Sequence, residues 1–427
     1  MVVERPLQIG VVGAGTAGSA AATLLARAGH TVTVFECVAD PRPVGAGITL
    51  QPTGQLALAR LGVLEDVEAR GARIDRLTCV RRGGKPLVDL PYADIDPRLY
   101  GLGIHRGVLF ETLLAAARGA GATIHCGVKI ERSELGASGR TLIADGGDRH
   151  GPYDLVIAAD GSVCELHGEA PRLRSKPYPW GALWLVVDDP GFAAQRTLHQ
   201  VVEGSRHLLG FLPTGMAPGR DAPVVSMFWS LRADRLEAWR AAGLSAWRDA
   251  VLRMDPRAEP ILDTLHDLEP VLFSRYRDVS MYPWHAERLV FLGDAAHAMS
   301  PQLGQGANLA LMDAITLAET IADEPNVERA LSAYSIARRR HLGFYQFATR
   351  ALTPMFQSDS RVLAWLRDRV FPHSRWFGYL RRRMVRTMVG IDLGLVRRPM
   401  QLAGILGAHA SLPAPDPSVG DGRTISR

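Results

Sequence analysis

Cysteine is scarce in this sequence. Its 427 residues include only four cysteines, Cys37, Cys79, Cys126 and Cys164, and these lie far apart without a CxxC pair. The usual cysteine frameworks of zinc sites and disulfide-rich folds are therefore excluded. We expect free thiols in a reducing compartment, no metal ion and a cytoplasmic protein.

Long apolar runs and a strong net charge are missing as well. No run reaches the roughly 18 residues of a membrane span, and residues 1–6 lead straight into an apolar segment, which leaves no room for a signal peptide. Basic side chains exceed acidic ones by only five, so nucleic acid is not an expected partner. Because 47% of the residues are hydrophobic, the chain can fill the cores of about two to three domains.

The N-terminal segment predicts a βαβ unit. Leu7–Val12 is a short apolar run typical of a buried parallel strand, Thr16–Gly29 is a helix rich in Ala and Leu, and Thr31–Glu36 is a second, β-branched strand. A buried parallel sheet must be covered on both faces, so the unit predicts a doubly wound α/β domain.

A motif of the form GxGxxG joins the first strand to the helix. Its first glycine permits a tight turn, its second lets a pyrophosphate approach the backbone, and its third allows close contact between helix and strand. The helix N-terminus offers unpaired N–H groups to phosphates, and an acid at the end of the second strand can bind a ribose hydroxyl, which favours FAD or NAD over NADP. The residues predicted to bind the dinucleotide here are Gly13, Ala14, Gly15, Thr16, Ala17, Gly18 and Glu36.

Two later segments also place an acid where an apolar strand ends. The Leu155–Ala159 strand is followed by Asp160, and the Leu289–Leu292 strand is followed by Gly293 and Asp294. Ligands bind at the carboxyl ends of strands in doubly wound sheets, so both acids are expected to contact the cofactor.

The third of these motifs continues through a proline-containing loop into a helix predicted over Asn308–Ile321. The start of that helix presents N–H groups and a positive dipole end, which suit negative charge on the pyrimidine side of a reduced flavin. For His297, inside the motif, we expect a structural rather than a catalytic role. The predicted cofactor contacts in this loop are Pro301, Gly304, Gln305, Gly306, Ala307 and Asn308.

The middle of the chain predicts a second domain. Between residues 178 and 232, apolar segments alternate with Pro- and Gly-rich turns, as in an antiparallel sheet. Helices are predicted over Leu56–Arg70, Val108–Ala120 and most of the chain after Ala330, and the composition of residues 413–427 predicts a frayed tail. The predicted strands of the second domain are Ala182–Val187, His207–Leu212 and Val224–Trp229.

In their order, these motifs resemble the single-component FAD-dependent aromatic hydroxylases of the para-hydroxybenzoate hydroxylase type. The resemblance spans residues 7 to about 350 and rests on GAGTAG, the Gly45–Gly62 stretch, His105-Arg106, DLVIAADG and GDAAHAMSPQLGQGANLALMDA. It implies that the N-terminal glycines and the acid hold the ADP half of FAD and that the loop of residues 301–308 lies along the isoalloxazine. Further contacts with FAD are implied for Gly47, Arg106, Val128 and Asp294.

The resemblance also implies a reaction and a domain plan. NADH or NADPH reduces FAD, O2 adds to give a flavin C4a-hydroperoxide, and one oxygen passes to a small aromatic substrate that is phenol- or amine-like, including polycyclic and polyketide-derived rings. The cofactor carries this chemistry, so no universal catalytic side chain is expected. We expect a Rossmann-like FAD domain, an inserted antiparallel-sheet substrate domain and a helical C-terminus. Their ranges are 1–72, 100–176 and 280–350 for the FAD domain, 73–99 and 177–279 for the substrate domain, 351–412 for the C-terminal helices and 413–427 for the tail.

Departures from the family pattern keep other functions open. Where the family has a Ser and then an Arg after the Asp-Gly pair, this chain has Cys164 and His167, and Cys37 replaces a residue that is often basic. A related flavoenzyme acting as an oxidase, dehydrogenase or halogenase is one alternative, although no Trp-x-Trp-x-Ile-Pro run supports a halogenase. An FAD-binding protein without turnover that serves as an interaction partner is another.

Candidate substrate contacts come from the predicted antiparallel sheet and its surroundings. From Arg361 to Arg398 there are ten Arg against two Asp. A solvated helical face explains this excess most simply, and peripheral membrane docking is the sharper hypothesis. We expect a monomer or a homodimer. The candidate substrate residues are Gln51, Trp184, His199, Phe211, Trp229 and Pro301.

Overall fold

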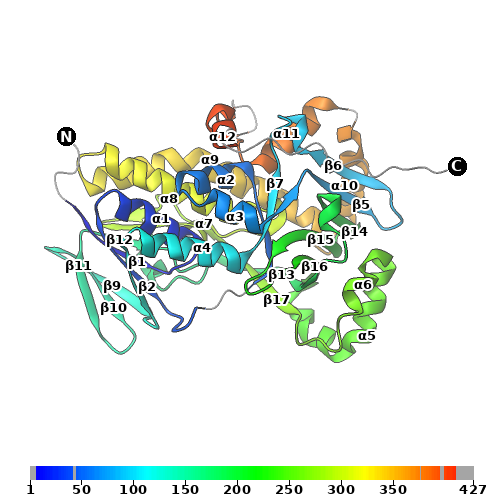
Figure 1. The fold of residues 1–427 in the computed structure, drawn as a ribbon, viewed down its shortest axis with the longest axis horizontal. Helices are drawn as coiled ribbons and strands as arrows, with labels where there is room; N and C mark the ends of the chain where they lie inside the picture. The colour runs from blue at the N-terminus through cyan, green and yellow to red at the C-terminus, as the bar shows by residue number, and fades with distance from the viewer. Residues whose placement is uncertain (1–5, 42–44, 376, 395–398, 410–427) are drawn as a thin grey trace.

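The computed structural model describes residues 6–41, 45–375, 377–394 and 399–409. Figure 1 shows an elongated molecule in which an α/β half and a half built around a second sheet lie side by side. The α/β half contains a six-stranded sheet of order β18-β19-β12-β1-β2-β8, parallel except for β18. Its strands are β1 (Gln8–Val12), β2 (Thr31–Glu36), β8 (Thr123–Cys126), β12 (Leu155–Ala158), β18 (His285–Ala286) and β19 (Leu289–Phe291).

Helices cover the faces of this sheet. Helix α1 packs against α4 and α8, and α8 packs against α9. Three consecutive alanines of α1, Ala20, Ala21 and Ala22, are fully buried, because their small side chains let the helix approach its neighbours closely. The chain then turns at Gly29, whose φ is +90°. The helices are α1 (Thr16–Arg27), α4 (Arg106–Gly119), α7 (Asp294–His297), α8 (Gly306–Asp323) and α9 (Val327–Phe356).

Two small sheets flank this core. One consists of β3 (Gly47–Leu50), β4 (Ala72–Ile74) and β7 (Gly101–His105), and the other is an antiparallel meander that the sequence analysis did not predict. The helix predicted as one segment over Leu56–Arg70 is two helices, because Gly62 adopts a left-handed φ of +68°. The remaining elements here are α2 (Pro52–Arg60), α3 (Leu64–Arg70), β9 (Ile130–Gly136), β10 (Gly139–Ala144) and β11 (Arg149–Tyr153).

A seven-stranded sheet of order β17-β13-β16-β15-β14-β5-β6 forms the second half. Its outer face is covered by α5 (Leu236–Met254) and α6 (Glu259–Leu262). Its inner face meets β3, where the amide of Gly47 donates to Ser226 Oγ at 2.8 Å. The strands are β5 (Arg76–Arg81), β6 (Pro86–Pro91), β13 (Arg174–Asp188), β14 (Thr197–Glu203), β15 (His207–Met216), β16 (Pro223–Arg232) and β17 (Leu272–Ser280).

Helices complete the C-terminal part, and the expected fold class is confirmed: a Rossmann-like parallel sheet, antiparallel sheets and a helical C-terminus. Within the described residues, no helix is both long enough and apolar enough to cross a membrane. The tail expected at residues 413–427 lies outside the described residues. The C-terminal helices are α10 (Arg361–Val370), α11 (Gly378–Val389) and α12 (Leu402–His409). Short 3-10 helices are η1 (Tyr92–Asp94), η2 (Glu165–Glu169), η3 (Ala193–Gln195), η4 (Ala233–Arg235), η5 (Pro256–Ala258), η6 (Pro301–Leu303) and η7 (Phe371–Arg375).

Candidate functional site

Backbone hydrogen bonds tie together the carboxyl ends of four neighbouring strands, β2, β1, β12 and β19. This places the three sequence motifs at one edge of the sheet, the edge at which doubly wound sheets bind ligands. The bonds run from the amide of Gly13 to the carbonyl of Phe35 (2.8 Å), from Ala159 to Val12 (2.8 Å) and from Leu292 to Ala158 (3.0 Å).

The three glycines of the first motif are needed for different reasons. A Cβ on Gly13, whose φ is +96°, would lie 2.6 Å from the carbonyl oxygen of Ala159, and a Cβ on Gly18 would lie 2.0 Å from that of Gly13. A Cβ on Gly15 would meet only the oxygen of Ala159, at 4.0 Å. The fold itself requires Gly13 and Gly18, whereas Gly15 borders space that a ligand can use.

Glu36 lies beside this motif at the end of β2. Its Oε2 accepts a hydrogen bond from the amide of Ala14 at 2.9 Å, and its Oε1 accepts one from the amide of Val38 at 3.0 Å. The amide of Val128 donates to the carbonyl of Glu36 at 3.0 Å. The structure therefore brings the predicted residues Ala14, Glu36 and Val128 together.

Asp160 follows β12 and has one oxygen without a protein partner. Its Oδ2 accepts from the amide of Glu165 at 3.1 Å, whereas its Oδ1 is buried and has no hydrogen bond within the described part of the chain. Burial raises the pKa of this carboxyl, against the lowering effect of its hydrogen bond from Cys164. The atypical His167 lies behind the third motif, with its Nε2 2.7 Å from the carbonyl oxygen of Ala295.

Helices α1 and α8 begin at this edge without a side-chain cap and without an acid in the first turn. Helices α4, α9 and α10 are capped by His105, Asn326 and Ser360, whereas α2 and α11 also lack both features, so what distinguishes α1 and α8 is their position at this edge. Two sets of backbone N–H groups are thus left for an anionic ligand. Asp294 is exposed. It lies beside the start of α8, where a Cβ on Gly306 would be 3.9 Å from its Oδ1.

The remaining predicted residues of the first and third motifs lie at or just before the starts of α1 and α8. Thr16 and Ala17 form the first turn of α1, and Ala307 is half-buried in the first turn of α8. Pro301 is exposed at the start of η6, and Gly304 ends that helix with a left-handed φ of +61°.

Asn308 and Gln305 use their side chains to hold the loop in place. Asn308 Oδ1 accepts from the amide of Gln51 at 2.8 Å, and its Nδ2 donates to the carbonyl of Thr49 at 3.2 Å. Gln305 Nε2 donates to the carbonyl of Met388 at 2.7 Å. Both side chains are buried, and both polar atoms of Asn308 are used within the protein, so a cofactor contact at this position falls to the backbone. Gln305 Oε1 has no hydrogen-bond partner within the described residues and stays available to a ligand.

Arg106 offers a cation near β3. Its amide donates to the carbonyl of Ala46 at 3.1 Å, and its side chain lies along Gly45, where a Cβ would be 3.2 Å from Arg106 Cβ. The side chain is exposed and has no ion-pair partner among the described residues. Gly47 sits at the contact between the two halves, where a Cβ would lie 2.4 Å from Thr214 Oγ1.

Apart from Pro301 in the loop, the structure separates the predicted substrate residues into two groups. Phe211 and Trp229 belong to the core between the seven-stranded sheet and α5–α6, and His199 is paired with Phe211 on the same outer face. These three side chains point away from the motifs, and their contact with substrate stays a prediction. Alternation along a strand showed that they share a face but not which layer covers that face.

Trp184 and Gln51 lie on the inner side of the seven-stranded sheet, the side that meets β3. The Trp184 ring is half-buried and packs against Phe228 with ring centroids 5.0 Å apart. Gln51 Oε1 accepts a hydrogen bond from Tyr92 Oη at 2.6 Å. A Cβ on Gly304 would lie 3.9 Å from Gln51 Nε2, which places this amide next to the third motif.

A buried charge network that the sequence analysis missed supports the third motif. Asp313 is fully buried; its Oδ2 lies 2.6 Å from His297 Nε2 and accepts from the amide of Gly293 at 2.9 Å, while its Oδ1 accepts from Arg338 Nε at 2.7 Å. Arg338 Nη1 in turn lies 2.9 Å from His341 Nδ1. His297 is thus held under the loop, in agreement with its expected structural role.

The network makes stability depend on pH through His341. Burial, followed by the charge of Arg338, lowers the pKa of His341 to about 3. In the unfolded chain this imidazole takes up a proton near pH 6.5, so stability falls as the pH drops below that value. Between about pH 7.5 and about pH 5.5 this one group costs about 1.4 kcal/mol. In His341→Gln, urea unfolding at the two pH values should show a pH-dependent loss smaller by that amount.

The matched control is His373→Gln, because His373 is exposed. The control should keep the wild-type pH dependence. An unchanged pH dependence in His341→Gln would show that His341 is protonated as readily in the folded state as in the unfolded chain.

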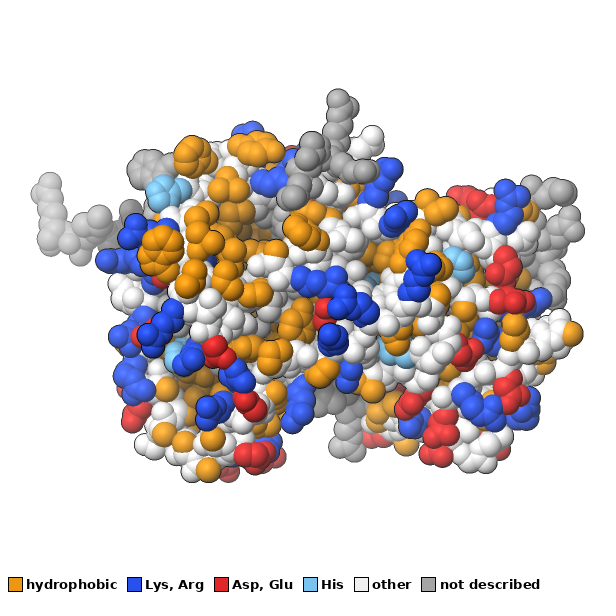
Figure 2. Space-filling model, turned by 180° about the vertical axis from the view of Figure 1, so that it is seen from behind, with side chains coloured by type: hydrophobic (Ala, Val, Ile, Leu, Met, Phe, Trp, Pro, Cys, Tyr) orange, Lys and Arg blue, Asp and Glu red, His pale blue; other side chains and the backbone are white. Residues whose placement is uncertain are grey.

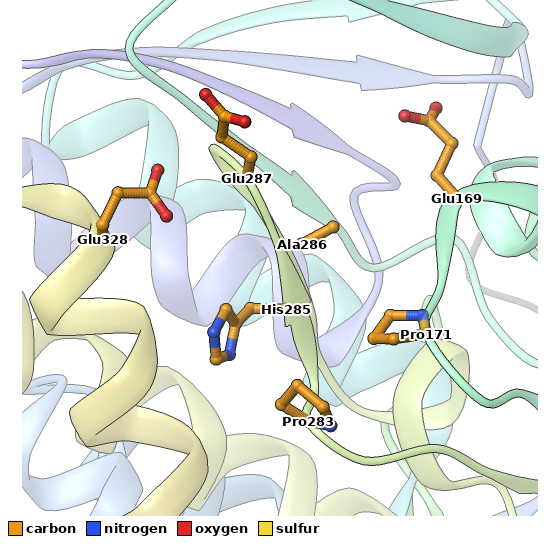
Figure 3. A pocket seen from close by; sticks show the side chains of 7 residues that line it. All are labelled: Glu169, Pro171, Pro283, His285, Ala286, Glu287 and Glu328. Atoms are coloured by element: carbon orange, nitrogen blue, oxygen red, sulfur yellow. The ribbon is translucent and has the colours of Figure 1, made fainter.

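An acidic pocket elsewhere is not part of this site. Figure 3 shows this pocket at β18 and the start of α9. Arg288 lies beside the pocket and precedes β19, so the pocket is at the end of that strand opposite to the motifs. His285 Nδ1 lies 2.8 Å from Ser335 Oγ, and Glu169 pairs with Arg140. Within the described residues no group of three or more His, Cys, Asp or Glu could hold a metal ion. The pocket is lined by Glu169, Pro171, Pro283, His285, Ala286, Glu287 and Glu328.

A parallel sheet with glycine, acid and uncapped helix starts at one edge defines a dinucleotide-binding α/β protein. Comparison with known proteins specifies the family. Residues 6–343 match the FAD binding domain family. The chain therefore belongs to this family, which confirms the resemblance to the aromatic hydroxylases.

Relatives agree over most of the chain. It is similar to the kynurenine 3-monooxygenase of Salinispora arenicola (strain CNS-205), with 30% identity over 368 residues, 79% of this chain and 77% of the relative. It is similar to the FAD-dependent urate hydroxylase of Klebsiella pneumoniae, with 29% identity over 350 residues, 77% of this chain and 85% of the relative. The solved structure of Klebsiella pneumoniae HpxO complexed with FAD and uric acid shares the fold, with a TM-score of 0.73, 21% identity and coverage of 91% of this chain and 98% of that chain.

Proposed function

We propose that this flavoprotein uses FAD, NADH or NADPH, and O2 to hydroxylate a small aromatic substrate that is phenol- or amine-like, including polycyclic rings. The observation that carries the proposal is the meeting of three motifs at one sheet edge, where space beside Gly15, the unpaired Oδ1 of Asp160 and two uncapped helix starts match the groups of a flavin dinucleotide. The names of the relatives, a kynurenine monooxygenase and a urate hydroxylase, support the reaction class.

In this proposal the residues around the first motif bind the adenosine and phosphate end of FAD. The N-terminus of α1 donates to the pyrophosphate, Glu36 accepts from a ribose hydroxyl, and Val128 borders the adenine. Asp160 Oδ1 accepts a hydrogen bond from a hydroxyl or N–H of the ligand, which removes the cost of leaving this buried oxygen unpaired.

In this proposal the flavin end of the cofactor faces the seven-stranded sheet. FAD, when bound, supplies the redox and oxygen chemistry. The N-terminus of α8 stabilises negative charge next to it, and Asp294 binds a ribityl hydroxyl. Trp184 on the inner face of β13 and Gln51 beside the loop then line a substrate chamber and exclude water. His167, held by the carbonyl of Ala295, takes the place of the usual Arg.

The test has two stages. In anaerobic stopped flow, NADH or NADPH should bleach the bound flavin faster when a productive aromatic compound is present. In air, mass spectrometry over phenols, anilines and polyketide-like aromatics should find a product heavier by one oxygen atom. Anaerobic bleaching followed, in air, by reoxidation of the flavin by O2 to give hydrogen peroxide with every compound and no oxygenated product would favour an oxidase. A flavin that neither nicotinamide reduces would favour a binding protein without turnover.

A further inference from the structure

Exposed apolar side chains concentrate on α10 and the start of α11. Trp365 is 58% exposed and Tyr379 is 78% exposed. Figure 2 shows hydrophobic side chains gathered among Lys and Arg side chains at the upper left, the end of the molecule where α10 and α11 lie. We call this the α10–α11 surface and define it by Val362, Trp365, Leu366, Val370, Phe377, Tyr379 and Leu380.

Helix α10 turns its apolar side outward and an arginine inward. Arg367 is fully buried, donates to the carbonyl of Met355 at 2.9 Å and to Asp368 at 2.7 Å, and lies over the ring of Phe356. Its helix start is capped by Ser360. These contacts fix the orientation of α10, so the outward position of its apolar residues is a property of the folded protein. A helix on a water-facing surface has the opposite arrangement.

The unpaired charges on this surface have one sign, and Asp94, an acid from outside these helices, pairs with Arg381 of α11. Arg361, Arg369 and Arg382 are exposed, and none has an ion-pair partner among the described residues. The acids of residues 361–394 are Asp368, which pairs with Arg367, and Asp392, which is fully buried. Arg369 lies over the ring of Trp365 with 5.3 Å between its Cζ and the ring centroid. The surface thus combines aromatic and aliphatic side chains with unpaired cations.

We propose that the α10–α11 surface docks on an anionic lipid membrane. Trp, Tyr and Phe side chains partition into the interface of a bilayer, and arginines beside them reach lipid phosphates. A second copy of this chain fits less well, because a two-fold contact through the surface would bring unpaired arginines against one another. Docking needs no turnover, so the proposal is independent of the reaction.

Vesicle flotation with the full chain tests the proposal. The wild-type protein should float with vesicles of phosphatidylcholine and phosphatidylglycerol at low salt, and far less with phosphatidylcholine alone. High salt should weaken the binding. The double variant Trp365→Ser with Leu366→Ser, and separately Arg361→Gln with Arg382→Gln, should each lower the fraction bound to anionic vesicles roughly tenfold or more.

Matched controls come from other exposed positions. Leu135→Ser with Ile336→Ser removes two exposed apolar side chains from outside the surface, and Arg118→Gln with Arg253→Gln removes two exposed cations. Both should bind as the wild type does. Circular dichroism should show all four variants folded, so that a loss of binding reports the surface.

Three results would overturn the proposal. The first is a wild-type protein that does not float with anionic vesicles at low salt. The second is an equal loss of binding in the control pairs. The third is a dimer in sedimentation velocity that Trp365→Ser with Leu366→Ser converts to a monomer, without vesicle binding by the wild type, which would assign the surface to a contact between two copies.

Discussion

Gly15→Val is expected to yield a folded but colourless protein. The backbone at this position has a φ of −67°, which any residue adopts, and a Cβ there meets no protein atom closer than 4.0 Å. The valine side chain instead occupies the space before the N-terminus of α1, where a pyrophosphate must approach the N–H groups. We expect the affinity for FAD to fall at least about 1,000-fold, or about 4 kcal/mol. The visible flavin absorbance of the purified protein and titration with added FAD measure this loss.

Two other glycines provide the controls for this experiment. Gly343→Val changes an exposed helical glycine with no atom near its Cβ position and should leave the protein yellow. Gly18→Ala places a Cβ 2.0 Å from the carbonyl oxygen of Gly13 and should prevent normal folding rather than only FAD binding. A yellow Gly15→Val protein with normal circular dichroism would mean that the dinucleotide does not lie against α1.

Local sequence signals predicted the nucleotide-binding half well. The strand before Gly13, the helix after it and Glu36 all lie where their patterns indicate, because each signal arises within about 30 residues of chain. The meeting of Asp160 and Asp294 with this unit could also be expected, since parallel strands bring their carboxyl ends to one edge. Which of these residues contact FAD remains a prediction.

The second half shows what a strand pattern cannot supply. Phe211 and Trp229 follow the alternation of a half-buried sheet, but both faces of this sheet are covered. The decision between faces depends on α5, which packs on the outer side, and on the contact of Ser226 with Gly47, 179 residues away in the sequence. Neither fact has a local signal. Asp313 is a different case, because an acid inside the apolar run of α8 indicates a buried partner without naming it.

Asp313→Asn is expected to destabilise the protein by about 3–5 kcal/mol, because it leaves the buried guanidinium of Arg338 without its carboxylate. Burial favours the protonated form of Asp313, but His297 and Arg338 together outweigh it and lower its pKa to about 2. The ionised form therefore stabilises the fold above about pH 4, and this contribution is lost as the pH falls toward about 2. Urea unfolding near neutral pH measures the free-energy difference.

Asp323→Asn in the same helix is the matched control, since Asp323 is exposed, and it should change the stability by less than about 0.5 kcal/mol. The double variant Asp313→Asn with Arg338→Met should lose less stability than the sum of the two single variants, because no unpaired charge stays in the core. Strict additivity in this cycle would contradict a direct interaction.

The Asp313→Asn variant should also bind FAD more weakly, because the amide of Gly293, which sets the turn before Asp294, donates to the carboxylate of Asp313. A variant with reduced stability and unchanged FAD affinity would show that Asp313 stabilises the core but does not influence FAD binding.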